Sequence, residues 1–328
     1  MFVSKDLRIP MLWGFAKENL IRTFCVSLFA VCLYEFAEFK FIAIPFLPIG
    51  TIGTAVAFYV GFKNNQAYDR LWEARKLWGG ITNTSRSITS MSIALIDDKE
   101  FVKEFLYRHI SYINLLRLQL RRNIPWATNK LSPHKAVVDS HKELEEFEEG
   151  LKKILTVNNK MQYYEEIKAK SNAASLLIKI QIENLTKLKR AKKIDDFEHS
   201  DLVKQLTELY NLQGGCERIK STPLFRQYSI FSRIFVIIFI FMLPFGLLKD
   251  LSELAHWGAW LTIPFSLLIS WVFYTMEQIG EYSENPFDNS INDTPISTIC
   301  RNIEIEIKEM LGEKDLPEKL SPVEGILL

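Results

Sequence analysis

The chain has 328 residues, of which 48% are hydrophobic and 24% are charged, and its formal net charge is +1. A balanced charge gives no reason to expect a nucleic-acid partner, because such partners favour a basic surface. The hydrophobic residues are concentrated in four stretches with almost no charge, which is not the pattern of an ordinary soluble protein. These stretches are residues 23–34, 41–62, 229–248 and 257–275.

The four stretches have, or approach, the length of a transmembrane helix. A hydrocarbon core of about 30 Å needs roughly 20 apolar residues per helix. The first stretch reaches this length when it is extended back to Leu12, with Lys17, Glu18 and Arg22 at the interface or facing protein. Buried helices of a soluble protein are the alternative, but residues 229–248 are apolar on nearly every face. We therefore predict four transmembrane helices.

The basic residues predict how the chain lies in the membrane. Of the 40 Lys and Arg residues, only Lys40 lies between the first two stretches and only Lys249 between the last two. Basic loops stay in the cytoplasm, so both termini and the middle segment are expected there. The N-terminus lacks an apolar core with a cleavage site, so we expect no signal peptide. The predicted parts are an N-terminal segment with two transmembrane helices (1–62), a cytoplasmic region (63–228), two further transmembrane helices (229–275) and a cytoplasmic C-terminal segment (276–328).

Outside the membrane stretches the sequence predicts further helices. No strand-like alternation persists and no internal repeat occurs, so we predict an all-α membrane protein whose spans continue into a helical cytoplasmic body. A Pro-rich loop is expected at 124–134, and the glycines of 214–223 are expected to end a helix. The predicted helices are 66–96, 98–122, 141–155, 161–194, 196–214 and 296–312.

The second stretch carries a face that two interpretations explain. Thr54, Phe58 and Phe62 are four residues apart, so they lie along one side of a helix, roughly 6 Å from one another. In the first interpretation the phenylalanines face lipid or pack between helices. In the second, several copies of this helix surround an axis, and the phenylalanines form stacked apolar rings that gate by dewetting. Small residues surround the face: Gly50, Gly53, Ala55, Ala57 and Gly61.

A polar and aromatic segment follows Phe62 without a break. We expect Lys63, Asn64 and Asn65 at the membrane edge, where polar groups should reappear. Trp78 lies more than two turns beyond that edge and is expected to pack against cytoplasmic helices. Arg70 and Glu73 are three residues apart and are expected to form an ion pair on the helix surface.

Residues 284–293, ENPFDNSIND, also have two interpretations. Oxygen-bearing side chains of this kind bind hard cations, but the segment lacks the EF-hand spacing and holds few carboxylates. The segment is more typical of a turn before a helix, in which Asp293 or Thr294 caps the helix that begins at 296. We favour the turn.

The sequence contains no catalytic or cofactor motif. The five histidines are scattered and match no metal or triad spacing, and no phosphate-binding or nucleophile motif occurs. The four cysteines show no C-x-x-C spacing and are expected to be reduced thiols. We therefore predict neither an enzyme nor a bound cofactor.

Three blocks of the sequence resemble the bacterial branch of the bestrophin family. They are GFKNNQAYDRLWEARKLWG (61–79), LQGGCERIKSTP (212–223) and IGEYSENPFDNSINDTPISTICRNIEIEIKEMLG (279–312). Their order and spacing relative to four spans also fit, so the resemblance covers most of the chain. The region 124–195 carries no match.

The resemblance implies a homopentameric ion channel around a central pore in a bacterial inner membrane. Five copies of the second span would line a narrow hydrophobic neck, with Thr54, Phe58 and Phe62 as its three levels. Family necks are usually apolar at every level, so Thr54 implies a wetter outer ring. A second, lower aperture is implied on the helix before GGCERI, at Ser200, Leu202 and Val203.

The animal members of the family hold calcium with a run of acids at the position of residues 284–293. Asn285 and Asp293 match that run in this chain, but Asp288 and the residues after it replace most of the acids. The resemblance therefore implies no calcium activation, and the segment is expected to pack and cap the cytoplasmic body.

The prediction is a channel for small monovalent ions, with the permeant ions, the lipid bilayer and further copies of the chain as partners. Glu35 and Glu38 in the outer turn favour cations, whereas Lys63 favours anions if it faces the pore. We predict cations. An anion (chloride) channel of the same architecture and a membrane-anchored scaffold without conductance are the alternatives. An alternating-access transporter would need inverted repeats, and the two halves of the chain show no repeat.

Overall fold

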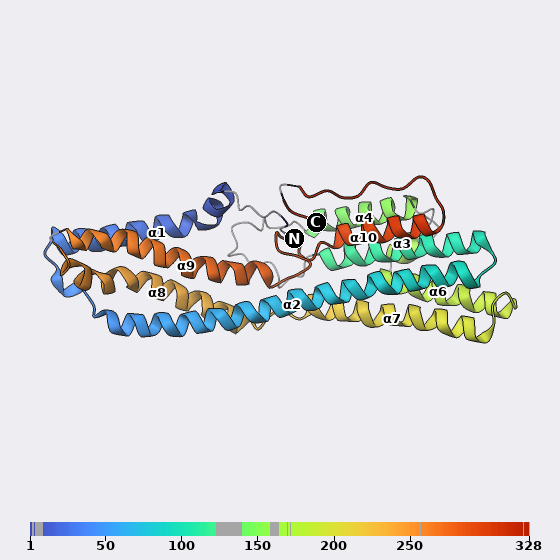
Figure 1. The fold of residues 1–328 in the computed structure, drawn as a ribbon, viewed down its shortest axis with the longest axis horizontal. Coiled ribbons are helices and arrows are strands. Elements are labelled where there is room, and N and C mark those ends of the chain that lie inside the picture. The colour runs from blue at the N-terminus through green and yellow to red at the C-terminus, as the bar shows by residue number, and fades with distance from the viewer. Residues whose placement is uncertain are drawn as a thin grey trace. The chain divides into compact units, whose positions relative to one another are not determined.

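The computed structural model describes residues 1, 3, 9–122, 140–157, 164–168, 170, 172–255, 257–323 and 325–327. These residues form helices joined by turns, and the one extended pairing among them is an isolated bridge between Val323 and Ile326 (Figure 1). The all-α prediction is therefore confirmed. The predicted Pro-rich loop at 124–134 lies outside the described residues.

The chain forms two compact units. The first, which we call the apolar unit, comprises Ser4–Arg70 and Leu224–Glu284. The second, the charged unit, comprises Met1–Val3, Leu71–Pro223 and Asn285–Leu328. Helix α2 (Phe46–Leu95) is an uninterrupted helix of 50 residues that contributes to both.

The apolar unit is made of long helices that lie side by side in Figure 1: α1 (Ile9–Glu35), the first part of α2, α8 (Arg226–Ser252) and α9 (Thr262–Ser283), with the 3₁₀ turns η1 (Lys40–Ile42) and η3 (Gly258–Leu261). Within the described residues, three segments have the length and composition to cross a membrane: Lys40–Leu95, Arg226–Ser252 and Gly258–Ser283.

Helix α1 differs from the other three in its charge. It has 27 residues, which is long enough to span a bilayer. Its N-terminal half carries Lys17, Glu18 and Arg22, and Glu18 and Arg22 are exposed and paired at 3.7 Å. Because α1 packs along both α8 and α9, it accompanies the apolar helices over much of their length.

The contact between α1 and α9 contains small and polar residues. Ser27 of α1 and Ser266 and Ser270 of α9 are fully buried. The side-chain amide of Asn19 donates to the carbonyl oxygen of Ser270 at 3.4 Å. Small residues let helices approach closely in lipid, where packing and hydrogen bonds replace the hydrophobic effect. This helix pair is therefore of a kind suited to a membrane.

The charged unit surrounds one apolar core with amphipathic helices. Asp98 caps α3 (Lys99–Arg121) by accepting a hydrogen bond from the backbone N–H of Phe101 at 3.1 Å. Asp195 and Glu198 form a capping box at the start of α7 (Asp196–Ser221). The helices are the end of α2, α3 (Lys99–Arg121), α4 (Ser140–Val157), α5 (Tyr164–Lys168), α6 (Ala173–Arg190), α7 (Asp196–Ser221) and α10 (Ile296–Met310).

Helix α7 continues through the two glycines at which the sequence predicted a break, so the predicted end at residue 214 is wrong. Leu77 of α2 packs on Gly215, and Leu212 of α7 packs on Gly80. A Cβ added at either glycine would lie 2.7 Å from the leucine Cδ2 atom. The glycines make room for a leucine from the facing helix, and this packing outweighs their low helix propensity.

The predicted continuous helix 161–194 is also wrong. Helix α5 ends at Lys168 and α6 begins at Ala173. The side chain of Asn172 caps α6 by accepting a hydrogen bond from the backbone N–H of Ser175 at 3.1 Å. Asparagine favours such capping bonds over the helix interior, and this preference divides the segment.

A buried histidine makes the charged unit sensitive to acid. His109 of α3 is fully buried, and its Nε2 atom lies 2.9 Å from the Ser85 hydroxyl. Burial lowers the pKa of His109 from 6.5 to about 4. The unfolded chain therefore binds a proton below pH 6.5 that the folded chain does not bind until about pH 4, so stability is lost as the pH falls through this range.

We expect lowering the pH from 7 to 4.5 to cost up to about 3 kcal/mol of unfolding free energy through this histidine. His109→Gln, which keeps a hydrogen-bonding group near Ser85 without a titratable ring, should remove that share of the pH dependence. Thermal unfolding of the detergent-solubilised protein at several pH values measures it. His199→Gln, at a half-buried histidine of α7, is the control. Equal acid sensitivity in all three proteins would contradict the assignment.

Candidate functional site

The candidate site is the face of α2 that carries Thr54, Phe58 and Phe62. The side chains of Phe58 and Phe62 are 66% and 59% exposed, although both lie in an apolar helix. On the opposite face Val56 and Val60 are buried against α8. The two phenylalanines are therefore on the side of α2 opposite Val56 and Val60.

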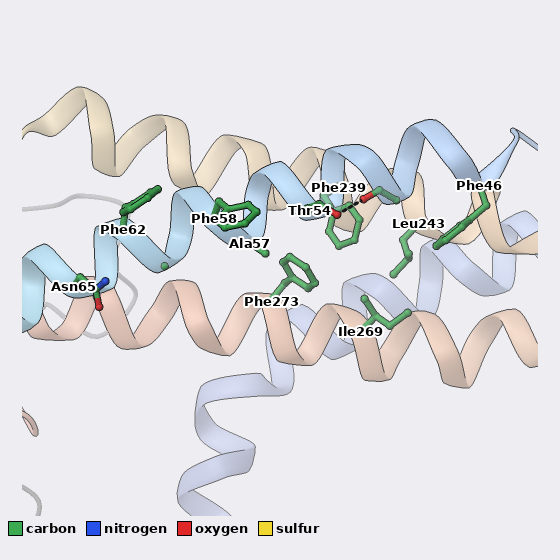
Figure 2. A pocket seen from close by; sticks show the side chains of 13 residues that line it. Phe46, Thr54, Ala57, Phe58, Phe62, Asn65, Phe239, Leu243, Ile269 and Phe273 are labelled. Carbon is green, nitrogen blue, oxygen red and sulfur yellow. Dashed lines mark hydrogen bonds between the residues drawn. The ribbon is translucent and has the colours of Figure 1, made fainter.

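Hollows flank this face on both sides. One of about 680 Å³ lies towards α8 and α9 and is lined by α2 together with Phe239, Leu243, Ile269 and Phe273 (Figure 2). A second of about 630 Å³ lies on the other flank, beside Phe46 and Leu47. The hollows exist because α2 carries small residues next to its large ones. Those in the first hollow are Gly50, Gly53, Ala57 and Gly61.

Thr54 is exposed on this face, but its hydroxyl proton is already used. Its Oγ1 atom donates to the carbonyl oxygen of Gly50 at 3.0 Å, one turn earlier in the helix (dashed line in Figure 2). Thr51 makes the same kind of bond to Leu47 at 2.9 Å. Thr54 thus offers the face a methyl group and an acceptor oxygen, and no free donor.

The polar residues after Phe62 do not all face outwards. Lys63 is fully buried and pairs with Glu277 of α9, which also accepts a hydrogen bond from Ser232 of α8 at 2.6 Å. The Asn64 side chain donates to the carbonyl oxygen of Met276 at 3.0 Å. Of these three residues, only Asn65 is exposed. Their position at the membrane edge stays a prediction, and Lys63 does not lie on the exposed face because it pairs with a residue of another helix.

The predicted pair of Arg70 and Glu73 is also wrong. Arg70 donates from Nε to the carbonyl oxygen of Glu284 at 3.1 Å, within the apolar unit. Glu73 pairs with Arg218 of α7, within the charged unit. Trp78 is fully buried in the core of the charged unit, so its predicted packing is confirmed.

The residues proposed for a lower aperture lie on α7 in different surroundings. Leu202 is fully buried in the core of the charged unit, so it does not line an opening. Ser200 and Val203 are half-buried and line a groove of about 420 Å³ with polar neighbours. Phe197 in the first turn of α7 is 81% exposed, and the sequence analysis did not single it out.

The segment 284–293 forms a turn, but neither predicted cap is made. The residue before α10 is Pro295, and Asp293 instead accepts hydrogen bonds from the backbone N–H and the hydroxyl of Ser290. Burial raises the pKa of Asp293 to about 6. Asp288 pairs with Lys220 at 2.8 Å, and Asn285 is half-buried. Within the described part of the chain, no three His, Cys, Asp or Glu side chains are grouped to hold a metal.

The fold and this face define a helical membrane protein of the bestrophin class. The model for the bacterial/fungal bestrophin family matches residues 16–309, and the chain belongs to this family. The predicted family and fold class are confirmed. Because relatives in this family are named as channel-forming proteins, the prediction that the chain is not an enzyme is also supported.

Curated relatives cover most of the chain. The voltage-dependent anion channel-forming protein YneE of Salmonella typhi is 29% identical over 306 residues, covering 93% of this chain and 90% of its own. The voltage-dependent anion channel-forming protein mll4386 of Mesorhizobium japonicum is 27% identical and covers 96% of this chain and 88% of its own. Among solved structures, a bestrophin homologue from Klebsiella pneumoniae matches with a TM-score of 0.77 at 24% identity, covering 91% of this chain and 99% of its own. This structural likeness concerns the fold alone.

The small residues behind the site can be tested by one substitution. A Cβ at Gly53 would lie 2.6 Å from Cε2 of Phe239, whose ring packs on Phe273 with centroids 4.6 Å apart. We expect Gly53→Ala to cost about 1–3 kcal/mol through overpacking, measured by thermal unfolding in detergent. Gly214→Ala, at a helix glycine with open space around it, should be neutral or stabilising. Equal effects of the two substitutions would contradict the close packing of α2 on α8.

Proposed function

We propose that this chain forms an ion channel whose neck is built from Thr54, Phe58 and Phe62 of several copies. The observation that carries the proposal is the exposure of two phenylalanines on one face of a membrane-length helix whose other face is packed. Copies of α2 around an axis would bring these rings together and exclude water. Such a hydrophobic constriction gates by dewetting.

The residues that follow on the same face are polar and are consistent with a pore. Asn65 and Asp69 are exposed, and they continue the spacing of Phe58 and Phe62 along α2. Both lie at or beyond the predicted membrane edge, where the wall of a pore would become polar as the neck widens into water. The hollows beside the face leave room for a helix of a neighbouring copy.

We propose anions as the permeant ions, and we give up the cation prediction. The relatives are named anion channel-forming proteins, which favours the alternative reading. Two of the charges that bore on the earlier prediction are also paired. Glu35 pairs with Lys40 at 3.8 Å, and Lys63 is buried with Glu277. No fixed charge therefore lies at the three neck positions, and small monovalent anions such as chloride are the proposed cargo.

The proposed assembly is a homopentamer in a bacterial inner membrane, with both termini in the cytoplasm. The resemblance in sequence and the concentration of Lys and Arg outside the spans support it.

We expect the detergent-solubilised protein to have the mass of five chains, the number that the sequence resemblance implies, because α2 cannot form a closed neck in one copy. Light scattering coupled to size exclusion, with the detergent mass subtracted, measures this. A monomer would contradict the channel proposal outright. A mass that corresponds to a closed ring of another number of chains would be compatible with the neck and would change only the number of copies that form it.

Ion flux from liposomes under a KCl gradient tests the function. Wild-type protein should conduct, with a reversal potential close to the equilibrium potential of chloride. Phe58→Ala and Phe62→Ala should each raise the flux at least about threefold, because a smaller side chain widens the constriction and weakens dewetting. Phe241→Ala, at a phenylalanine of α8 that is 55% exposed, is the matched control and should leave the flux unchanged.

Each other outcome of this experiment has a distinct meaning. A reversal potential near the potassium equilibrium value would restore the cation reading. Alanine variants that behave like the control would place the neck elsewhere. No flux from folded, reconstituted wild-type protein would leave a membrane-anchored scaffold as the function.

A further inference from the structure

A buried ion pair lies next to the proposed neck, and the function described above does not use it. Lys63 of α2 and Glu277 of α9 are 0% and 2% exposed and bind each other directly. The second carboxylate oxygen of Glu277 accepts a hydrogen bond from Ser232 of α8 at 2.6 Å, and Ser232 is also 0% exposed. Three helices of the apolar unit therefore meet at one carboxylate.

The ion pair lies on the face of α2 that is turned away from the proposed pore. Successive residues of an α-helix differ by about 100° in direction, so Lys63 points well away from the side of Phe62. Arg70, seven residues further on, lies on the same side as Lys63 and donates to the carbonyl oxygen of Glu284 at the end of α9. Phe58, Phe62 and Asp69 occupy the exposed side.

A second contact holds the same turn of α2. Asn64 donates to the carbonyl oxygen of Met276 at 3.0 Å. Its Oδ1 atom fits against Gly280, where an added Cβ would lie only 2.1 Å away. The segment directly below the proposed neck is thus attached to α9 by directed polar contacts, whereas Val56 and Val60 lie in an apolar cluster with residues of α8 and α9.

We propose that Lys63, Glu277 and Ser232 are positioning residues that fix the rotation of α2 about its own axis and so aim Phe58 and Phe62 into the pore. Ionisable residues in membrane segments are costly and are usually retained for function. A charge pair with a hydrogen-bonded third partner has one favourable geometry, because any rotation of α2 separates buried charges. Apolar packing alone would allow α2 to rotate more freely about its axis. The inference rests on the proposed neck.

Disulfide cross-linking between subunits reports the rotation without measuring conduction. Single cysteines replace Phe62 or Gln66 in a background that carries Cys25→Ser and Cys32→Ser, and an oxidant is added to the assembled protein. With the pair intact, Phe62→Cys should cross-link at least about three times more than Gln66→Cys, since Phe62 is nearer the centre of the exposed face.

The pair is then removed as Lys63→Met with Glu277→Gln, so that no charge is left buried alone. The ratio of cross-linking at 62 to that at 66 should fall at least threefold. Ser232→Ala is a milder variant, which frees only one carboxylate oxygen, and it should lower the ratio by about half. Glu18→Gln with Arg22→Gln removes the exposed pair of α1 and should leave the ratio unchanged.

The ratio separates positioning from stability, because a purely structural loss lowers the yield of assembled protein and not the relative cross-linking within it. If the double variant does not assemble, Ser232→Ala decides the question. An unchanged ratio in the assembled variants overturns the inference and leaves the neck intact. Absence of cross-linking at Phe62→Cys with the pair intact would instead overturn the proposed neck.

Discussion

The proposed neck depends on how α2 is held by one face only. In a soluble protein, a helix with two exposed phenylalanine rings would ordinarily turn them inwards. Removing each ring from water stabilises the fold by about 1.5–3 kcal/mol. In this chain the inward side is already occupied by Ile49, Val56 and Val60 against α8, and by Lys63 against Glu277. The rings can therefore contact lipid or other copies of the same helix. In a membrane, packing and shape decide between these two contacts.

Much of this arrangement is visible in the sequence. The separation of apolar stretches from charged ones predicted the helical class, and the four-residue spacing of Thr54, Phe58 and Phe62 predicted a shared face. Both follow from local periodicity, which needs no knowledge of neighbours. Neither depends on distant residues, so a single sequence was sufficient for them.

The wrong predictions concern positions where a residue distant in the sequence determines the local structure. Gly215 was taken as a break because glycine is a poor helix former, but Leu77 of another helix packs on it. The burial of Lys63 could not be predicted from its neighbours, because its partner Glu277 lies 214 positions later in the chain. Glu73 was paired with its neighbour Arg70 because i, i+3 pairs are common, and Arg218 took it instead. Local rules name a residue's preference, and tertiary contacts override it.

The buried pair of Lys63 and Glu277 also bears on why the helix is not held by apolar residues alone. Replacing a buried ion pair by well-packed apolar side chains is often neutral or stabilising, so stability is a poor reason to keep one. Directional bonds distinguish between neighbouring rotations of a helix, and an apolar surface does so less sharply, as polar residues in coiled-coil cores illustrate. In a neck made of uncharged rings, no electrostatic interaction between the rings fixes the direction of each side chain. The accuracy of its geometry then has to come from the far side of the helix, where Glu277 holds both α2 and α8.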